Sequence, residues 1–240
     1  MAVTKDAYKI TSVIAMSDTK AKLIRIEPTD LGITLREIYN SLSNLCWINN
    51  LPNTSRMFKM SVQRRAERTV EKLEKELKLS PDSSVSSSAG EYIVSELAHS
   101  SLVNDFGYLD IPLAELFKQK AKGNPGFDFF AVNPQKVIML FGEAKYSSTT
   151  NAYERAFKQV FDFVEVDGKD VMDMADLEHF CSEDVQDNVA NGIKGYVAAF
   201  SSTSMSDKVL KSHIEKDEHY QNLLKYEEVV CVAVNITGNE

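Results

Sequence analysis

Two acidic residues and one lysine stand where two neighbouring strands could bring them together. Asp128 lies at the start of the apolar segment 127–132. Glu143 and Lys145 lie at the end of the next apolar segment, 137–146. Carboxylate oxygens are the ligands that Mg²⁺ prefers, and a bound divalent cation activates water and stabilises developing negative charge. A lysine beside the cation can orient or deprotonate that water. Together these residue types are the ones that phosphodiester hydrolysis requires.

The pairing of the two strands decides whether the three side chains meet. A tight turn at 133–136 would place Asp128 opposite Phe141 in an antiparallel pair. Side chains alternate between the two faces of a strand, so Asp128 then shares a face with Glu143 and Lys145. A slip of one residue would move Asp128 to the other face. The register is therefore part of the prediction.

The pattern of an acid, any residue and a lysine is a weak signal, because it occurs four times in the chain. Only Glu143-Ala144-Lys145 follows an apolar strand segment and has an acid on a preceding strand. The alternative is a salt bridge at the sheet edge, formed by Lys145 with Asp128 or Glu143. A short motif of this kind depends on its structural context.

Apolar periodicity and turn signals predict an α/β fold, with a mixed central sheet flanked by helices. The predicted helices cover residues 35–48 (with Thr34 as the cap), 57–79, 90–103, 151–164 and 207–225. The predicted strands cover residues 7–16, 21–27, 113–120, 127–132, 137–146, 194–200 and 229–236. Helix stays open for 113–120, and the acidic segment 165–192 is expected to be rich in loops with at most a short helix.

A polar, serine-rich segment at 80–88 divides the predicted elements into two groups. Such segments behave as flexible joints. We therefore expect an α+β region at 1–80, which would contact DNA or a partner, and a main domain at 88–240. The main domain has the order helix, three strands, helix and strand, followed by a further helix and strand.

The net charge of -8 limits how this chain could meet nucleic acid. Contacts from lysine and arginine to phosphates supply most non-specific affinity for DNA, so an acidic chain binds DNA poorly by itself. Either basic residues cluster locally or a partner delivers the substrate. Arg64, Arg68 and Lys72 recur at helical spacing and form one positive stripe, which could meet DNA or an acidic partner. A solvated helix face is the alternative.

The remaining composition points to an ordinary soluble chain. The three cysteines are scattered, which argues against a disulfide framework and against a zinc site. No apolar run is long enough to span a membrane, and the first residues lack the apolar core of a signal peptide. We therefore expect a cytoplasmic protein that makes no contact with a membrane.

The residues at both strands resemble a known family. Pro125-Gly126-Phe127-Asp128 followed by Gly142-Glu143-Ala144-Lys145 resembles the signature of the PD-(D/E)xK nuclease superfamily. Residues 123–128, the block 141–146 and the following helix also resemble the nuclease subunit of the Hachiman antiphage defence system. The likeness covers about residues 88–165, a third of the chain.

The resemblance implies a restriction-endonuclease-like αβββαβ core with an N-terminal extension. It also implies metal-dependent hydrolysis of DNA, as an endonuclease or exonuclease, and a helicase as the partner subunit. In this family Asp128 and Glu143 would hold Mg²⁺, or Mn²⁺ as a substitute, together with the backbone carbonyl of Ala144. Lys145 would position the water. The chain itself is expected to bind no nucleotide.

The superfamily often adds a carboxylate from the first core helix. Glu91 is our choice for this catalytic and metal-binding position, and Glu96 is the second candidate. Five positions separate them, so they point in different directions on a helix. Two other functions stay open: a catalytically inactive nuclease fold that serves as an interaction module, and a homodimeric restriction-type endonuclease.

Overall fold

The computed structural model describes residues 2–52, 54–77, 87–118, 126–203 and 205–236. The predicted joint at 80–88 lies almost entirely outside these residues, and so do Gly123, Asn124 and Pro125 of the motif stretch. Residues 78–79 of the predicted helix 57–79 and residues 119–120 of the predicted strand 113–120 also lie outside, whereas all of the predicted site residues are described.

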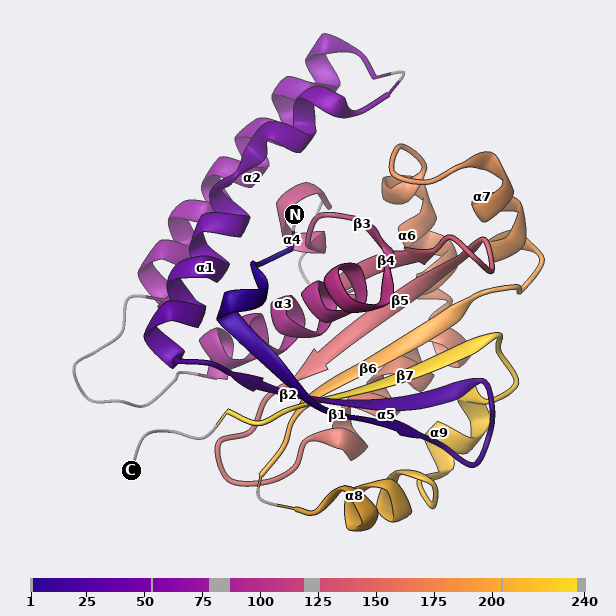
Figure 1. Cartoon of the computed structure of the whole chain (residues 1–240). Coiled ribbons are helices and arrows are strands. Elements are labelled where there is room, and N and C mark those ends of the chain that lie inside the picture. Colours follow the sequence, from indigo (N-terminus) through magenta and orange to yellow (C-terminus); the bar gives the residue numbers. More distant parts are fainter. Residues whose placement is uncertain (1, 53, 78–86, 119–125, 204, 237–240) are drawn as a thin grey trace.

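A seven-stranded mixed sheet forms the centre of the molecule (Figure 1). The strands are β1 (Tyr8–Ala15), β2 (Ala21–Pro28), β3 (Leu109–Asp110), β4 (Phe129–Asn133), β5 (Ile138–Lys145), β6 (Gly195–Ser201) and β7 (Glu228–Val234). They lie in the order β1-β2-β7-β6-β5-β4-β3. Strands β2, β7, β6 and β5 run parallel to one another. The pairs β1–β2, β5–β4 and β4–β3 are antiparallel. This confirms a mixed α/β fold.

Helices cover both faces of this sheet (Figure 1). They are α1 (Leu31–Ser43), α2 (Arg56–Leu77), α3 (Ser87–Phe106), α4 (Ala114–Phe117), α5 (Tyr153–Phe161), α6 (Lys169–Leu177), α7 (Glu183–Ala190), α8 (Asp207–Ile214) and α9 (Glu218–Leu223). Helix α3 contacts four central strands, whereas α5 packs on β5 and β6 from the other side. Helices α1 and α2 stack outside α3. None of the described helices combines the length and apolarity needed to cross a membrane.

Burial of the strands follows their place in the sheet. The central strands β6 and β7 are buried along their whole length, and so is β5 up to Ala144. Strand β1 at the edge alternates between more and less exposed residues. Strands covered on both faces read as continuous apolar runs, which is why the sequence predicts β5 and β7 well.

For the segment 113–120, where the sequence predicts a strand and leaves a helix open, the structure has a helix. Residues 114–117 form the short helix α4, and the edge strand is β3, only two residues long. Ala114, Leu116 and Phe117 are buried, which is a helical spacing and not the alternation of a half-buried strand. With β3 as the first of the three strands, α4 lies between β3 and β4, and α6 and α7 lie between α5 and β6, so the chain has additional helices within the predicted order of elements.

Two further predictions were wrong in detail. The helix predicted from 35 begins at Leu31, and its cap is Asp30, whose side chain accepts the N–H of Ile33 at 2.9 Å. Thr34 lies inside the helix and donates to the carbonyl of Ala7. The acidic segment 165–192 is largely helical, because α6 and α7 occupy it.

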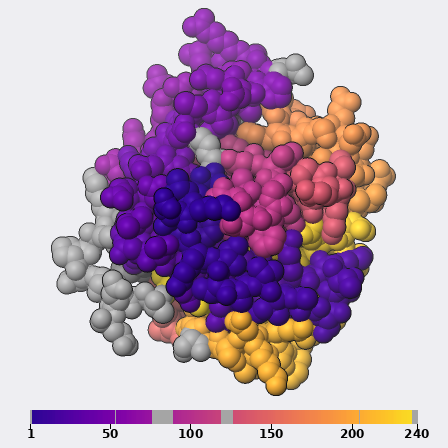
Figure 2. Space-filling model, viewed as in Figure 1, coloured from indigo at the N-terminus to yellow at the C-terminus, as the bar shows by residue number. Residues whose placement is uncertain are grey.

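The N-terminal strands belong to the same sheet as the main domain. Strand β2 pairs in parallel with β7, for example Ile24 with Val232. In the space-filling view the indigo N-terminal residues pack directly against the magenta and yellow segments (Figure 2). The boundary predicted at 80–88 therefore does not coincide with a boundary in the sheet.

The register between β4 and β5 differs by two residues from the predicted one. Phe130, and not Asp128, lies opposite Phe141. Val137 belongs to the turn, where its backbone is left-handed with φ 56°. Strand β5 therefore starts one residue later than expected. A shift of two residues keeps every side chain on its predicted face. The error therefore leaves Asp128 close to Glu143.

Candidate active site

Glu143 lies at the centre of the site. It belongs to the buried strand β5, and only 2% of its surface is exposed. Its Oε1 atom lies 2.5 Å from the Nζ atom of Lys145. Its Oε2 atom is buried and has no hydrogen-bond partner among the described residues. Buried polar atoms are nearly always hydrogen-bonded, so this oxygen calls for a functional explanation.

Asp128 is held beside Glu143 by three backbone contacts. Its own N–H donates to the carbonyl of Gly142 at 2.9 Å, and its carbonyl accepts the N–H of Ala114 at 3.1 Å. Its Oδ2 atom accepts the N–H of Ala144 at 3.0 Å. The N–H of Ala144 thus orients the carboxylate of Asp128. The predicted role of the Ala144 carbonyl as a metal ligand stays a prediction.

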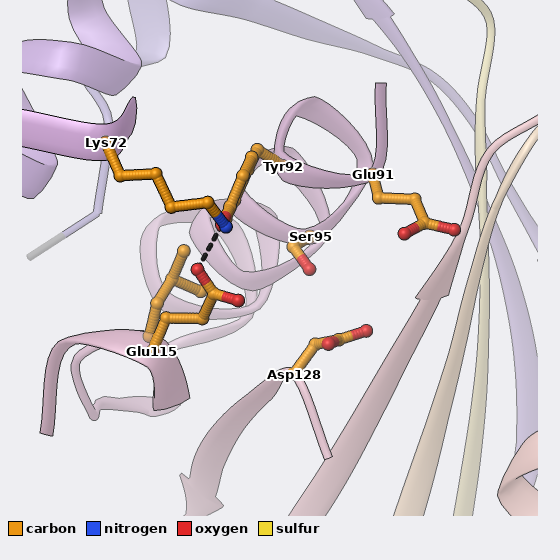
Figure 3. Close-up of a pocket in the computed structure, with 7 residues that line it drawn as sticks. Lys72, Glu91, Tyr92, Ser95, Glu115 and Asp128 are labelled. Atoms are coloured by element: carbon orange, nitrogen blue, oxygen red, sulfur yellow. Dashed lines mark hydrogen bonds between the residues drawn. The ribbon is translucent and has the colours of Figure 1, made fainter. Parts of the chain in front are cut away.

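Glu91 and Asp128 line the same pocket, which has a volume of about 150 Å³. Figure 3 shows that the carboxylates of both residues turn toward one side of this pocket, away from the other charged residues that line it. Glu91 comes from the first turns of α3, and Asp128 from the residue before β4. The structure therefore brings a helix carboxylate and a strand carboxylate to one cavity.

Two glycines allow this close arrangement. A Cβ atom on Gly90 would lie 2.3 Å from the ring of Tyr146, so glycine lets α3 pack against the residue that follows β5. A Cβ atom on Gly142 would lie 2.3 Å from the ring of Phe129 on the paired strand. Both positions directly precede an acidic residue of the site, and larger side chains there would push the backbones apart.

The four predicted residues interact electrostatically. Burial raises the pKa of Glu143 well above its ordinary value, and the charges of Asp128 and Glu91 add to this effect, whereas Lys145 opposes it. Burial lowers the pKa of Lys145, but the charges of Glu143, Asp128 and Glu91 outweigh burial and raise it overall. Lys145 is therefore protonated at neutral pH, and Glu143 binds a proton readily.

Carboxylates are the ligands that a divalent cation such as Mg²⁺ prefers. When all three are ionised, Glu91, Asp128 and Glu143 carry three negative charges against the single positive charge of Lys145. A divalent cation would balance the remaining charge, and the buried Oε2 atom of Glu143 would gain a partner. Among the described residues, no three His, Cys, Asp or Glu side chains already stand at the spacing of a metal site. A cation would therefore have to draw the carboxylates together.

Glu96, the alternative to Glu91, points elsewhere. It is buried, and it accepts the hydroxyl of Ser41 at 3.2 Å. Because Ser41 belongs to α1, Glu96 faces the layer of helices outside α3 and not the pocket. The structure thus places Glu91, and not Glu96, beside Asp128.

The buried carboxyl of Glu96 leads to a prediction about stability. Burial raises its pKa to about 7, so the free energy that it contributes to folding is complete below 4.5 and is lost as the pH rises through 7. Glu96→Gln replaces the carboxyl by a group that does not ionise, so the variant does not lose this free energy as the pH rises. Relative to the wild type, the variant should gain on the order of 3 kcal/mol in unfolding free energy between pH 4.5 and pH 8.5. Denaturant unfolding at both pH values measures the gain.

The matched control is Glu178→Gln, because the Glu178 side chain is 55% exposed. The control should track the wild type at both pH values. A Glu96→Gln variant that also tracks the wild type would contradict the assignment of a raised pKa to this carboxyl.

The three basic residues of the predicted stripe on α2 do not all lie at the candidate site. Lys72 lines the pocket together with Glu91 and Asp128 (Figure 3). The side chain of Arg64 is 81% exposed and lies 3.6 Å from Glu67. Arg68 is also exposed on α2 but does not line the pocket. Of the three basic residues predicted to contact DNA or a partner, only Lys72 reaches the candidate site.

The pocket also contains residues that the sequence did not indicate. Tyr92, Ser95 and Glu115 line it, and the hydroxyl of Tyr92 donates to the carboxylate of Glu115 (Figure 3). Ser95 follows Glu91 by four positions, so helical spacing could have indicated it. Glu115 could not be found in this way, because the sequence left open whether its segment forms a strand or a helix.

No protein-family model matches the chain, and no curated protein matches it either. The resemblance drawn from the two strand motifs is thus carried by the residues of the site alone.

Proposed function

We propose that this chain is a metal-dependent nuclease that hydrolyses DNA phosphodiester bonds, with Asp128, Glu143 and Lys145 at the centre of its active site. One observation carries the proposal. The Oε2 atom of Glu143 is buried and has no partner among the described residues, while the other oxygen binds Lys145. An unpaired buried carboxylate oxygen is costly, and such costs concentrate where a protein performs chemistry.

The order of the elements supports the same proposal. From α3 to β6 the chain has a helix, three strands, a helix and a strand in this order, with α4 between β3 and β4 and with α6 and α7 between α5 and β6. The acidic residues come from the first helix, the loop before β4 and the end of β5. Apart from these additional helices, the order agrees with the restriction-endonuclease-like αβββαβ core that the resemblance to PD-(D/E)xK nucleases implies.

Each residue then has a distinct task. Asp128, Glu143 and Glu91 would hold Mg²⁺ or Mn²⁺, which supplies an activated water and a centre of positive charge when bound. Because its pKa is raised, Lys145 acts as a charged donor that orients the water and stabilises the phosphate. Lys72, on the other wall of the pocket, would contact a phosphate of the substrate.

A partner subunit is part of the proposal. The chain carries a net charge of -8, and a duplex repels an acidic protein unless basic residues neutralise its phosphates. Arg64 and Arg68 are exposed on α2 and free of the pocket, which makes this face suitable for a partner that delivers DNA. A helicase subunit, as the resemblance to the Hachiman system implies, would fill that role.

The second candidate function is an inactive nuclease fold that mediates an interaction. The observation in its favour is the short contact of 2.5 Å between Lys145 and Glu143, which is also what a structural ion pair would show. The two functions differ in metal binding. A structural remnant would bind no divalent cation at Asp128, whereas a nuclease must.

The test compares two variants that lose the same charge. The full chain is incubated with supercoiled plasmid DNA and Mg²⁺ or Mn²⁺, and metal binding is measured in parallel by calorimetry. Asp128→Asn should lose both metal binding and cleavage. Asp162→Asn, directly after the last residue of α5 and 40% exposed, should retain both. A wild-type chain that binds no divalent cation would contradict the proposal, as would undiminished cleavage by Asp128→Asn.

A further inference from the structure

A second pocket, of about 340 Å³, lies at the opposite end of the sheet from the candidate active site. Glu143 and Lys145 stand at the C-terminal end of β5. The second pocket is formed at the N-terminal ends of the parallel strands, by the start of β2, the start of β7 and the turn between β4 and β5. The segment after α3 completes it. We call it the lysine pocket, after Lys20, Lys22 and Lys136, which line it.

The carboxylate of Glu228 anchors the lysine pocket. Only 4% of the surface of Glu228 is exposed. Its Oε1 atom accepts from the hydroxyl of Tyr108 and, at 3.0 Å, from Lys22. Its Oε2 atom accepts from Asn133 at 2.7 Å and lies 3.2 Å from Lys136. Four donors thus surround one carboxylate, which leaves it little capacity to accept from a ligand.

The three lysines keep donors available. Lys22 donates to Tyr108 and Glu228, and it lies over the rings of Phe106 and Tyr108. Lys136 reaches Glu228 and the carbonyl of Glu227. An ammonium group has three N–H donors, so each retains one. Lys20 makes no side-chain hydrogen bond or ion pair with any other described residue.

The charge of the lysine pocket is opposite to that of the chain. Three lysines face one glutamate there, although the chain as a whole carries -8. Like charges held at the rim of one cavity repel each other, and a bound anion relieves that repulsion. A phosphate monoester carries between one and two negative charges and several strong acceptor oxygens, which matches this set of donors.

We propose that the lysine pocket binds the phosphate group of a small ligand, separately from the candidate active site. The pocket volume lies in the range of small-molecule sites. A polymer such as DNA needs many cationic contacts along its backbone, whereas this cluster is confined to one cavity. The proposal departs from the expectation that the chain binds no nucleotide, because a mononucleotide has the required chemistry.

Calorimetric titration of the full chain with inorganic phosphate, and separately with adenosine monophosphate, tests the proposal. The double variant Lys20→Ala with Lys136→Ala should bind the tighter of the two probes at least about tenfold more weakly. The matched control is Lys5→Ala with Lys9→Ala, which removes the same charge from side chains that are 62% and 63% exposed elsewhere. The control should bind like the wild type.

The two probes separate the sources of the phosphate group. Equal affinity for both means that free phosphate is sufficient, and tighter binding of adenosine monophosphate indicates a nucleotide. The proposal is overturned if the wild type shows no saturable binding, or if the control loses as much affinity as the double variant. Tighter binding of a short oligonucleotide at the same lysines would also overturn it. Asp128→Asn should leave binding unchanged, so the result does not depend on the nuclease function.

Discussion

Replacing Lys145 by alanine is expected to lower the rate of metal-dependent DNA cleavage by about 10²–10³-fold. Lys145 is the cationic side chain in direct contact with Glu143, and the surrounding carboxylates keep it protonated. Without it, the negative charge that develops on the phosphate loses its positioned donor. The initial rate of plasmid nicking at saturating metal measures the loss, and calorimetry shows whether the metal still binds.

Lys194→Ala is the matched control for this variant. Lys194 is a buried lysine next to a strand of the sheet, and like Lys145 it pairs with a buried carboxylate, that of Asp170. Its removal costs stability as the removal of any buried ion-pair partner does, but it should leave cleavage by the folded fraction intact. Equal losses of activity in the two variants would show that Lys145 has only a structural role.

Replacing Glu143 by glutamine is expected to stabilise the metal-free protein and to abolish its response to metal. Burial raises the pKa of Glu143 above its ordinary value of 4.5. Its contribution to stability is therefore complete below 4.5 and is lost as the pH rises, because the folded state then has to hold a buried charge. Glutamine has the shape of the protonated acid, so the variant should unfold at a higher temperature than the wild type at pH 8.

With metal present, the wild type should instead unfold at a higher temperature than Glu143→Gln. A cation that binds only the folded state, present at about 100 times its Kd, stabilises by about 2.7 kcal/mol. For a chain of this size, that raises the unfolding temperature by roughly 5–10 °C. The wild type should show this shift with Mn²⁺, and Glu143→Gln should not. Thermal unfolding with and without Mn²⁺ at pH 8 measures both effects.

Glu154→Gln makes the same chemical change on the exposed face of α5 and serves as the control. It should match the wild type in both conditions. If Glu143→Gln is less stable than the wild type without metal, the carboxylate of Glu143 is a favourable structural partner of Lys145. The interaction-module function would then be the better account of the site.

The sequence by itself determined the face on which the site residues lie. Apolar runs over 127–132 and 137–146 predict β4 and β5, because strands buried on both faces need apolar side chains at every position. Alternation along these strands then places Asp128 with Glu143 and Lys145. The register was wrong by two residues, since Val137 adopts a left-handed turn conformation that a β-branched residue rarely takes. Asp128 and Glu143 still lie on the same face of the sheet, because side chains on a strand return to the same face every two residues.

Local pattern could not place the short elements. Strand β3 has only two residues and α4 has four, so each contains only about one period of an apolar pattern, which is too little to distinguish a strand from a helix. Their positions follow from contacts with distant residues, such as the pairing of Leu109 with Val132 and the hydrogen bond from Ala114 to Asp128. For this reason Glu115, which lines the pocket, was not among the predicted site residues.

Only the tertiary structure decided which helix residues share the pocket with Asp128. Glu91 and Glu96 lie on one predicted helix, and the apolar pattern of that helix does not indicate which of its faces packs against the sheet. The packing of α1 outside α3 buries Glu96 against Ser41, and the close approach at Gly90 brings Glu91 to the end of β5. The pairing of β2 with β7 likewise joins residues about 200 positions apart. Such contacts depend on how whole elements stack, because the sequence around each residue describes only its own element.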